Sequence, residues 1–354
     1  MQYPLKFVPV FKDYLWGGQN LKKLGKQFPG DKAAESWEIS AHKDGMSIVA
    51  NGPLAGKTLT ELVSEFKEGF VGTLSFSRYQ DRFPLLLKLI DAQDSLSVQV
   101  HPNDTYAQTY ENDLGKTEMW LILEAAPDAA IIYGFKLNMT REAFAEAIAA
   151  SKIGDCLKSM DVKKGDVIYI PAGTVHAIGK GIMIAEIQQS SNATYRLYDF
   201  DRKNPDGTTR PLHIQKALDT INFDDLTRKG IYKGLPIKPQ DGLVIRPIIA
   251  DPHFCTEILE IDGKAEQNAD SRSFQTLMIT DGSGELVYDN EALPLSKGES
   301  VLIPANTGHY AIKGRLTALR SYIGDVQTDI IQPLLEAGYS RQEIDAEVAG
   351  LDQF

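Results

Sequence analysis

Four polar side chains in the first half of the sequence could together bind a divalent metal ion. Gln99 and His101 lie in the run 97–102, where apolar and polar residues alternate, and this alternation predicts a β-strand. Residues i and i+2 of a strand share a face, so the two side chains project together, about 7 Å apart along the backbone. With Glu118 and His176 they offer an amide oxygen, two imidazoles and a carboxylate. This donor set suits a divalent ion such as Zn²⁺.

The composition of this set also indicates the chemistry. A single carboxylate on a dication leaves net positive charge, which is suited to stabilising an oxyanion as a Lewis acid. An iron site for oxygen chemistry more usually has two histidines and one carboxylate, so Gln99 makes a metal oxygenase the less favoured interpretation. For a histidine taken alone, a partly buried side chain satisfied by hydrogen bonds is the simpler interpretation, and Glu118 alone could be a solvated residue on a strand face. A structural polar network without metal is therefore the remaining alternative.

Basic residues lie near these candidates in the sequence. Lys116 precedes Glu118 by two positions and so shares its strand face. Lys88 interrupts the apolar run 85–90, where a lysine requires a buried anionic partner. Ser97 shares the face of Gln99 and could donate a hydrogen bond to a bound anion.

Two arginines follow the strand expected after residue 176. Arg196 ends the run 191–196, and Arg202 lies six residues later in Asp-Arg-Lys, where an exposed charge is the simpler interpretation. In an acidic protein, positive charge gathered beside a metal site favours a phosphorylated or otherwise anionic substrate.

An internal repeat indicates the elements that must position the last ligand. Residues 164–176 (KGDVIYIPAGTVH) align without gaps with residues 297–309 (KGESVLIPANTGH). Each copy predicts a strand, a Pro-Ala-X-Thr turn and a second strand, and duplication of this unit implies two copies of one small β-barrel. The phrase matches the second signature of the cupin fold, a double-stranded jelly roll. The first signature fits loosely, because Gln99 replaces its first histidine and Glu118 lies further along.

The chain is therefore expected to be mostly β with small helical elements, arranged as two cupin-type jelly-roll lobes. Residues 1–240 are predicted to form the catalytic lobe with its small helical segments, and residues 241–354 a C-terminal lobe without a metal site. His309 ends the second repeat but has no partner ligands nearby, so we interpret it as a turn histidine. Helices are predicted at 58–69, 140–150 and 213–218, and the segments 119–123 and 130–133 are predicted to be a pair of strands.

Composition limits the partners. The chain has 354 residues, a net charge of −11 at pH 7 and two cysteines without a spacing motif. The negative charge disfavours nucleic acid and anionic membranes as partners, and the two cysteines read as reduced thiols. The first residues contain no apolar segment typical of a secretory signal. We expect a cytoplasmic protein that is a monomer or a weak homo-oligomer, without membrane or nucleic-acid partners.

Several motifs together resemble those of the type I mannose-6-phosphate isomerases, especially the short bacterial class. They are the Tyr-Leu-Trp-Gly-Gly and Glu-Ser-Trp-Glu phrases at 14–18 and 35–38, and the segments 96–102, 116–120, 171–176 and 191–196. The resemblance covers the N-terminal two thirds, and the C-terminal cupin lobe also fits. The large helical insertion of the longer enzymes is missing here.

The resemblance implies one zinc ion per chain and the interconversion of mannose 6-phosphate and fructose 6-phosphate through a cis-enediol(ate). Carried over by motif, the zinc ligands would be Gln99, His101, Glu118 and His176.

The resemblance also implies roles for the basic residues. Arg196 and Lys116 would be catalytic, whereas Ser97, Lys88 and Arg202 would bind the sugar phosphate. The general base is open among Lys116, a metal-bound hydroxide and Glu38. The alternative function is a non-catalytic cupin that binds a sugar phosphate.

Overall fold

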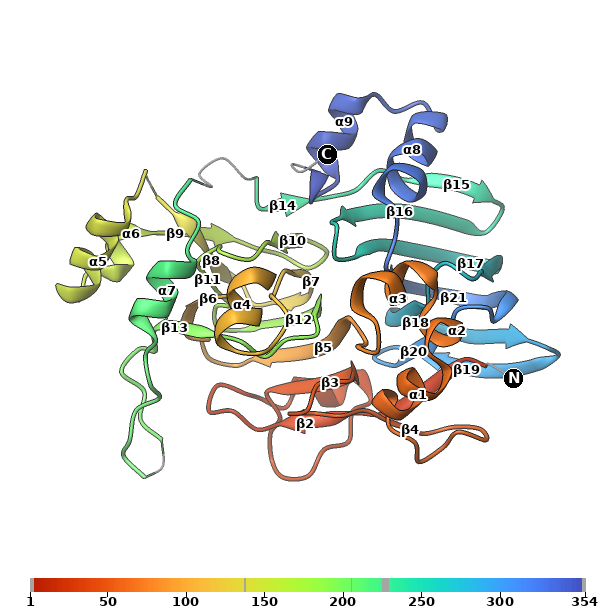
Figure 1. Ribbon diagram of the computed structural model, residues 1–354, viewed down its shortest axis with the longest axis horizontal. Coiled ribbons are helices and arrows are strands. Elements are labelled where there is room, and N and C mark those ends of the chain that lie inside the picture. Colours follow the sequence, from red (N-terminus) through yellow and green to blue (C-terminus); the bar gives the residue numbers. More distant parts are fainter. Residues whose placement is uncertain (1–2, 137, 205, 225–228, 352–354) are drawn as a thin grey trace.

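The computed structural model describes residues 3–136, 138–204, 206–224 and 229–351, and it is mostly β with small helices, as the sequence predicts. Its named strands form three sheets, of nine, seven and five strands. Figure 1 shows two groups of strands side by side.

The first lobe is built from two of these sheets. The seven-stranded sheet runs in the order β14 (Ile231–Tyr232), β10 (Val167–Ile170), β7 (Glu118–Ala125), β12 (Ile182–Gln189), β5 (Leu85–Ala92), β3 (Glu35–Ser40) and β2 (Val10–Lys12). The five-stranded sheet runs in the order β13 (Tyr195–Tyr198), β6 (Val98–Val100), β11 (His176–Ala177), β8 (Ala130–Phe135) and β9 (Leu157–Asp161).

The inner strands of the seven-stranded sheet are buried on both faces, as in β3, β5 and β12. Along β7, Trp120 and Ile122 pack with Ile131 and Tyr133 of the five-stranded sheet, so they face the interior of the first lobe. Met119 and Leu121 point the other way and join a cluster that includes second-lobe residues such as Phe254, Met278 and Leu319. Side chains alternate along a strand, so residues with the parity of Trp120 point into the first lobe. Glu118 has that parity.

The prediction that segments 119–123 and 130–133 pair with each other is wrong. Strand β7 pairs with β10 and β12, whereas β8 pairs with β11 and β9 in the other sheet. Both segments are strands, but in a jelly roll successive strands can belong to opposite sheets. Residues Trp120 and Tyr133 therefore meet across the core and not along a ladder.

The internal repeat is a repeat of structure. In the first copy β10 leads through the turn to β11, and in the second β20 (Ser300–Ile303) leads to β21 (Gly308–Tyr322). The third turn position is left-handed in both copies, with φ of 88° at Gly173 and 63° at Asn306. Glycine and asparagine are the residues that tolerate this conformation, which explains the one position where the turns differ.

The second lobe contains the nine-stranded sheet. Its main path is β15 (Ile237–Gln240), β16 (Leu243–Ala250), β17 (Cys255–Ala269), β21, β18 (Gln275–Tyr288), β20, β1 (Leu5–Val8) and β4 (Ile48–Val49), and β19 (Glu291–Ser296) pairs with β18. Strand β1 thus crosses to the second lobe, where Leu5 pairs with Leu302. The division at residue 240 stays a prediction.

The predicted helices are present. Helix α1 (Leu59–Phe66) begins with a capping box at Thr58, α5 (Arg141–Ala149) is capped by Thr140, and α7 is Ile214–Thr220. The remaining helical segments are η1 (Asn20–Leu24), α2 (Glu68–Val71), α3 (Thr73–Tyr79), α4 (Asp104–Tyr110), α6 (Ile153–Cys156), η2 (Gln327–Ile331), α8 (Gln332–Glu336) and α9 (Arg341–Glu347). Within the described ranges, no helix has the length and apolar character needed to cross a membrane.

Candidate metal centre

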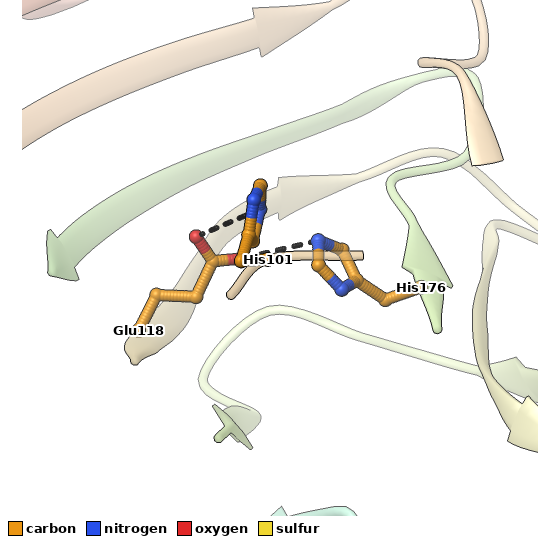
Figure 2. Close-up of side chains that lie close together, drawn as sticks. All are labelled: His101, Glu118 and His176. Carbon is orange, nitrogen blue, oxygen red and sulfur yellow. Dashed lines mark ion pairs between the residues drawn. The ribbon is translucent and has the colours of Figure 1, made fainter. Parts of the chain in front are cut away.

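Strand register brings the four predicted ligands together. In the five-stranded sheet β6 lies between β11 and β13, and Gln99 is opposite His176 on one side and Arg196 on the other. His101 follows β6 directly. Glu118 begins β7 and points into the lobe from the opposing sheet. Figure 2 shows its carboxylate directed toward the two imidazole rings.

Three of the four offer ligand atoms that converge. Glu118 Oε2 lies 3.6 Å from His101 Nε2, and Glu118 Oε1 lies 3.3 Å from His176 Nε2. One ligand atom from each residue falls within 4.8 Å of the other two, and all three side chains are buried. Among the described residues this is the group of histidine, cysteine and acidic side chains that could hold a metal ion.

The outer nitrogens of both imidazoles are held by backbone carbonyls. His101 Nδ1 lies 2.9 Å from the carbonyl oxygen of Ala193, and His176 Nδ1 lies 2.9 Å from that of Thr174. A carbonyl accepts a hydrogen bond only from a protonated nitrogen, so Nδ1 carries the proton and Nε2 keeps its lone pair. This arrangement orients metal-binding histidines in many proteins.

The charge states fit a metal site. Burial lowers the pKa of His101 well below its usual value and that of His176 to about 4, so both rings are neutral at pH 7. Burial also raises the pKa of the Glu118 carboxyl, although Lys116 opposes that shift. Lys116 Nζ lies 2.9 Å from Glu118 Oε2, whereas Oε1 has no hydrogen-bond donor among the described residues. A buried carboxylate that is only partly compensated is costly, and a dication between it and two neutral imidazoles would remove that cost.

Gln99 lies at the edge of this group. Its Nε2 is 3.4 Å from His176 Nε2, and its Oε1 is 3.4 Å from the Ser97 hydroxyl. The two ends of an amide are nearly isosteric, so a rotation of the amide would turn its oxygen toward the ligand atoms. The predicted fourth donor is thus within reach of the other three.

Lys116 and Lys88 both approach the centre. Lys116 Nζ lies 3.0 Å from His101 Nε2 and 2.9 Å from Glu118 Oε2, so it is adjacent to two ligand atoms. Lys88 Nζ lies 3.6 Å from Glu35 and 3.3 Å from Glu186. Burial alone would lower the pKa of Lys88, but these two carboxylates outweigh it and raise the pKa. The expectation of a buried anionic partner for Lys88 is confirmed.

A cavity of about 320 Å³ opens beside the centre. Its lining includes Gln99, Lys116, Ser97 and Arg196. The Arg196 guanidinium is held by its Nε, which donates to Ser97 Oγ at 3.3 Å, and by a terminal nitrogen, which donates to the carbonyl of Pro211 at 2.9 Å. The remaining lining residues include Tyr14, Trp16, Glu35, Lys88, Trp120, Glu186, Asn192, Thr194 and Arg210.

Two predicted residues lie outside this cavity. Arg202 is not in the lining, and its guanidinium instead binds Asp199 at 2.6 Å and the carbonyl of Ser95 at 2.6 Å. Glu38 is bound by Lys26 at 2.6 Å and Ser36 at 2.6 Å, and it does not line the cavity either. The geometry therefore favours neither a phosphate role for Arg202 nor a base role for Glu38.

Sequence reasoning missed Arg210 and Glu186. Arg210 lines the cavity, and its guanidinium is bound by both oxygens of Asp199. Glu186 accepts a hydrogen bond from Trp120 Nε1 at 2.9 Å and pairs with Lys88. A glutamate within an otherwise apolar strand is the same signal that identified Lys88, so Glu186 could have been found. Arg210 lies in a polar run that carries no such signal.

His309, the histidine that ends the second copy of the repeat, has different surroundings from the candidate ligands. The side chain of His309 is 70% exposed and pairs with Glu266 at 2.9 Å. Its place on the surface contrasts with that of His176, its counterpart in the repeat, which is fully buried.

Comparisons with known proteins give a consistent result. Residues 5–128 match the family model of the catalytic domain of type I phosphomannose isomerase, and residues 248–323 match the model of the cupin domain of mannose-6-phosphate isomerase.

Individual relatives match this chain along almost the full length of the relative. The chain is 38% identical to mannose-6-phosphate isomerase ManA of Bacillus subtilis, over 90% of this chain and 99% of that protein. It is 37% identical to the mannose-6-phosphate isomerase of Streptococcus mutans, over 91% and 99%. The crystal structure of mannose 6-phosphate isomerase from Bacillus subtilis superimposes with a TM-score of 0.83 at 37% identity, over 90% of this chain and 99% of that chain.

Proposed function

The chain belongs to the type I phosphomannose isomerases, and we propose that it interconverts mannose 6-phosphate and fructose 6-phosphate with one bound zinc ion. His101, Glu118 and His176 would hold the ion, with the Gln99 amide oxygen as the fourth ligand. The observation that carries this proposal is the convergence of three buried ligand atoms within 4.8 Å of one another, next to Gln99 and Lys116, which line a cavity that also contains Lys88, Arg196 and Arg210. A cytoplasmic location and a monomeric or weakly oligomeric state stay predictions.

The reaction moves a proton between C1 and C2 of the sugar, through an enediolate with negative charge on oxygen. Bound zinc would supply Lewis-acid stabilisation of that charge. Arg196 lines the same cavity and is already held by Ser97 and Pro211, so its positive charge is preorganised. Lys116 lines the cavity, and its Nζ lies within 3.0 Å of a ligand atom of His101 and 2.9 Å of one of Glu118. It is the residue we propose to move the proton.

Lys88 and Arg210 suit different parts of the substrate. Glu35 and Glu186 balance the positive charge of Lys88. These three buried side chains can therefore form hydrogen bonds to sugar hydroxyls without excess positive charge. Arg210 shares the carboxylate of Asp199 with Arg202, but only Arg210 of the two lines the cavity, and Arg202 also lies 3.9 Å from Asp94. We propose that Arg210, together with Ser97, attracts the phosphate.

Removal of the metal should abolish turnover. We expect protein treated with a chelator to release no fructose 6-phosphate from mannose 6-phosphate, and added Zn²⁺ to restore the rate. Metal analysis of the purified protein, combined with a coupled assay of fructose 6-phosphate, measures both. Full activity of metal-free protein would contradict the proposal. Binding of mannose 6-phosphate without any product in the zinc-loaded protein would instead support the non-catalytic sugar-phosphate-binding cupin.

Replacement of the two arginines that bind Asp199 should separate their roles. We expect Arg210→Ala to raise KM for mannose 6-phosphate about tenfold, since a charge-assisted hydrogen bond contributes about 1.5–3 kcal/mol. Arg202→Ala should raise KM less, because Arg202 does not line the cavity. Steady-state kinetics of both variants provide the comparison. A larger effect at Arg202 would restore the expectation drawn from the family resemblance.

A further inference from the structure

A histidine of the second lobe contacts the first lobe close to the candidate centre. His253 lies in the turn between β16 and β17, and its Nδ1 is 2.6 Å from Asp251 Oδ1 in the same turn. Its Nε2 reaches across to α4, where it lies 3.0 Å from Asp104 Oδ2. A neutral imidazole has one N–H, so only the protonated ring can donate to both carboxylates.

The turn itself is firmly held. Asp251 is 1% exposed, and its second oxygen accepts a hydrogen bond from the hydroxyl of Tyr169 in β10. Arg78 of α3 donates to the carbonyl of Pro252 at 2.7 Å. The next residue but one, Phe254, is fully buried in the cluster between the lobes. The turn that carries His253 is therefore fixed in place by the hydrogen bonds and burial of its neighbours.

Asp104 links His253 to the segment that carries Lys116 and Glu118. Its Oδ1 accepts hydrogen bonds from the backbone N–H of Gly115 at 2.7 Å and from Gln189 Nε2 at 3.1 Å. Gln189 in turn accepts from the backbone N–H of Thr117 at 2.9 Å. Gly115 packs so closely that an added Cβ would lie 2.5 Å from the backbone nitrogen of Asp104. Two alternate amides of this segment are thus bound through Asp104 and Gln189.

We propose that His253 is a positioning residue for the isomerisation: it holds Asp104 so that Asp104 and Gln189 fix the backbone of residues 115–118. The side chains of Lys116 and Glu118 start from that backbone. A displacement of about 1 Å at a reacting group can reduce the rate about a hundredfold, so loss of the bridge should appear in kcat. This inference rests on the proposed function.

The charge of His253 also gives the bridge a pH dependence. Burial would lower the pKa of His253, but hydrogen bonds and charges from Asp104 and Asp251 outweigh it and raise the pKa to about 9. The other titratable or charged groups around the turn are Arg78 and Tyr79 of α3, Tyr169 of β10 and Cys255 of β17. Because the pKa is raised, the contribution is complete below about pH 6.5 and disappears as pH rises through about 9.

The test compares full-length, zinc-loaded variants. We expect His253→Ala to lower kcat about tenfold while KM changes less than twofold and the zinc content is unchanged. Asp104→Ala should lower kcat similarly, and the double variant should be no worse than the poorer single variant, because both changes break one bridge. His309→Ala, which removes an exposed histidine of the same lobe, is the matched control and should keep the wild-type kcat.

Two further readouts separate positioning from general stability. The ratio of wild-type to His253→Ala kcat should fall toward one as pH rises through about 9, since wild type then lacks the charge as well. Amide hydrogen exchange at Gly115 and Thr117 should be faster in the variant. If His253→Ala does not fold, His253→Gln replaces it, because glutamine keeps a hydrogen-bond donor without the charge. The ratio of wild-type to His253→Gln kcat should likewise fall toward one as pH rises through about 9.

The outcomes that overturn the inference are distinct from those that overturn the function. An active wild-type enzyme whose His253→Ala variant keeps kcat, or single-variant losses that multiply in the double variant, would refute the positioning role. A wild-type protein that does not isomerise mannose 6-phosphate would refute the function. In that case amide exchange still decides whether His253 fixes the backbone of residues 115–118. Unchanged exchange at Gly115 and Thr117 in His253→Ala would refute this role of His253.

Discussion

His176→Ala is expected to lose zinc and to lower kcat by at least about a hundredfold. The imidazole is one of three converging candidate ligands, and its Nδ1 is already held by Thr174, so its Nε2 is fixed toward Glu118. Removal leaves His101, Glu118 and the neutral amide of Gln99, and an amide oxygen is not among the usual strong zinc donors, so the site should bind zinc much more weakly. The loss of one preorganised electrostatic group alone costs about 10²–10³ in kcat. Metal analysis and the coupled fructose 6-phosphate assay measure both effects.

The internal repeat supplies the control for this experiment. His309→Ala removes the aligned histidine of the second copy, which is exposed and paired with Glu266. We expect wild-type zinc content and activity, and thermal unfolding of both variants shows whether burial of residue 176 matters for folding. Equal zinc content and equal activity in the two variants would refute the assignment of His176 as a ligand.

Arg196→Ala is expected to keep zinc and to lower kcat by about a hundredfold. Arg196 is opposite Gln99 in the strand register, but its guanidinium lines the cavity and contacts Ser97 without reaching the ligand atoms. Its charge would therefore act on the negative charge that develops on the substrate. An interaction made mainly in the transition state lowers kcat and kcat/KM together when it is removed.

The control for Arg196 is an arginine distant from the cavity. Arg246 lies on β16 of the second lobe and pairs with Glu260 at 3.2 Å, so Arg246→Ala should leave kcat, KM and zinc content unchanged. If Arg196→Ala lost zinc, Arg196 would belong to the support of the metal centre. If it raised only KM, its charge would serve substrate binding equally in the ground and transition states.

Three of the four candidate metal ligands could be predicted from sequence because they lie in short elements with a clear pattern. Alternation placed Gln99 and His101 on one face, and the repeat placed His176 at the start of a strand. The register that pairs His176 with Gln99 then follows from two neighbouring strands. Lys88 was found for a physical reason as well: an ammonium in an apolar strand needs a carboxylate, and Glu35 and Glu186 provide two.

The cavity wall could not be predicted in the same way. Arg202 and Arg210 lie in one polar stretch, and only the fold decides which of them faces the cavity while Asp199 binds both. The sheet membership of β7 and β8 was also hidden, because adjacent strands look alike in sequence whether they pair or face each other. His253 acts across the two lobes, and no local pattern reports a contact between positions so far apart.

The pairing of β1 with β20 has a consequence for how the protein is made. Leu5 is synthesised long before its partner Leu302. Until then the nascent chain carries an unpaired strand edge, which is a site for pairing with other chains. The entropy cost of closing a loop grows only slowly with its length, so β1 can still pair with β20 once β20 has been synthesised. A fragment that stops before residue 300 would keep this edge open and should therefore aggregate.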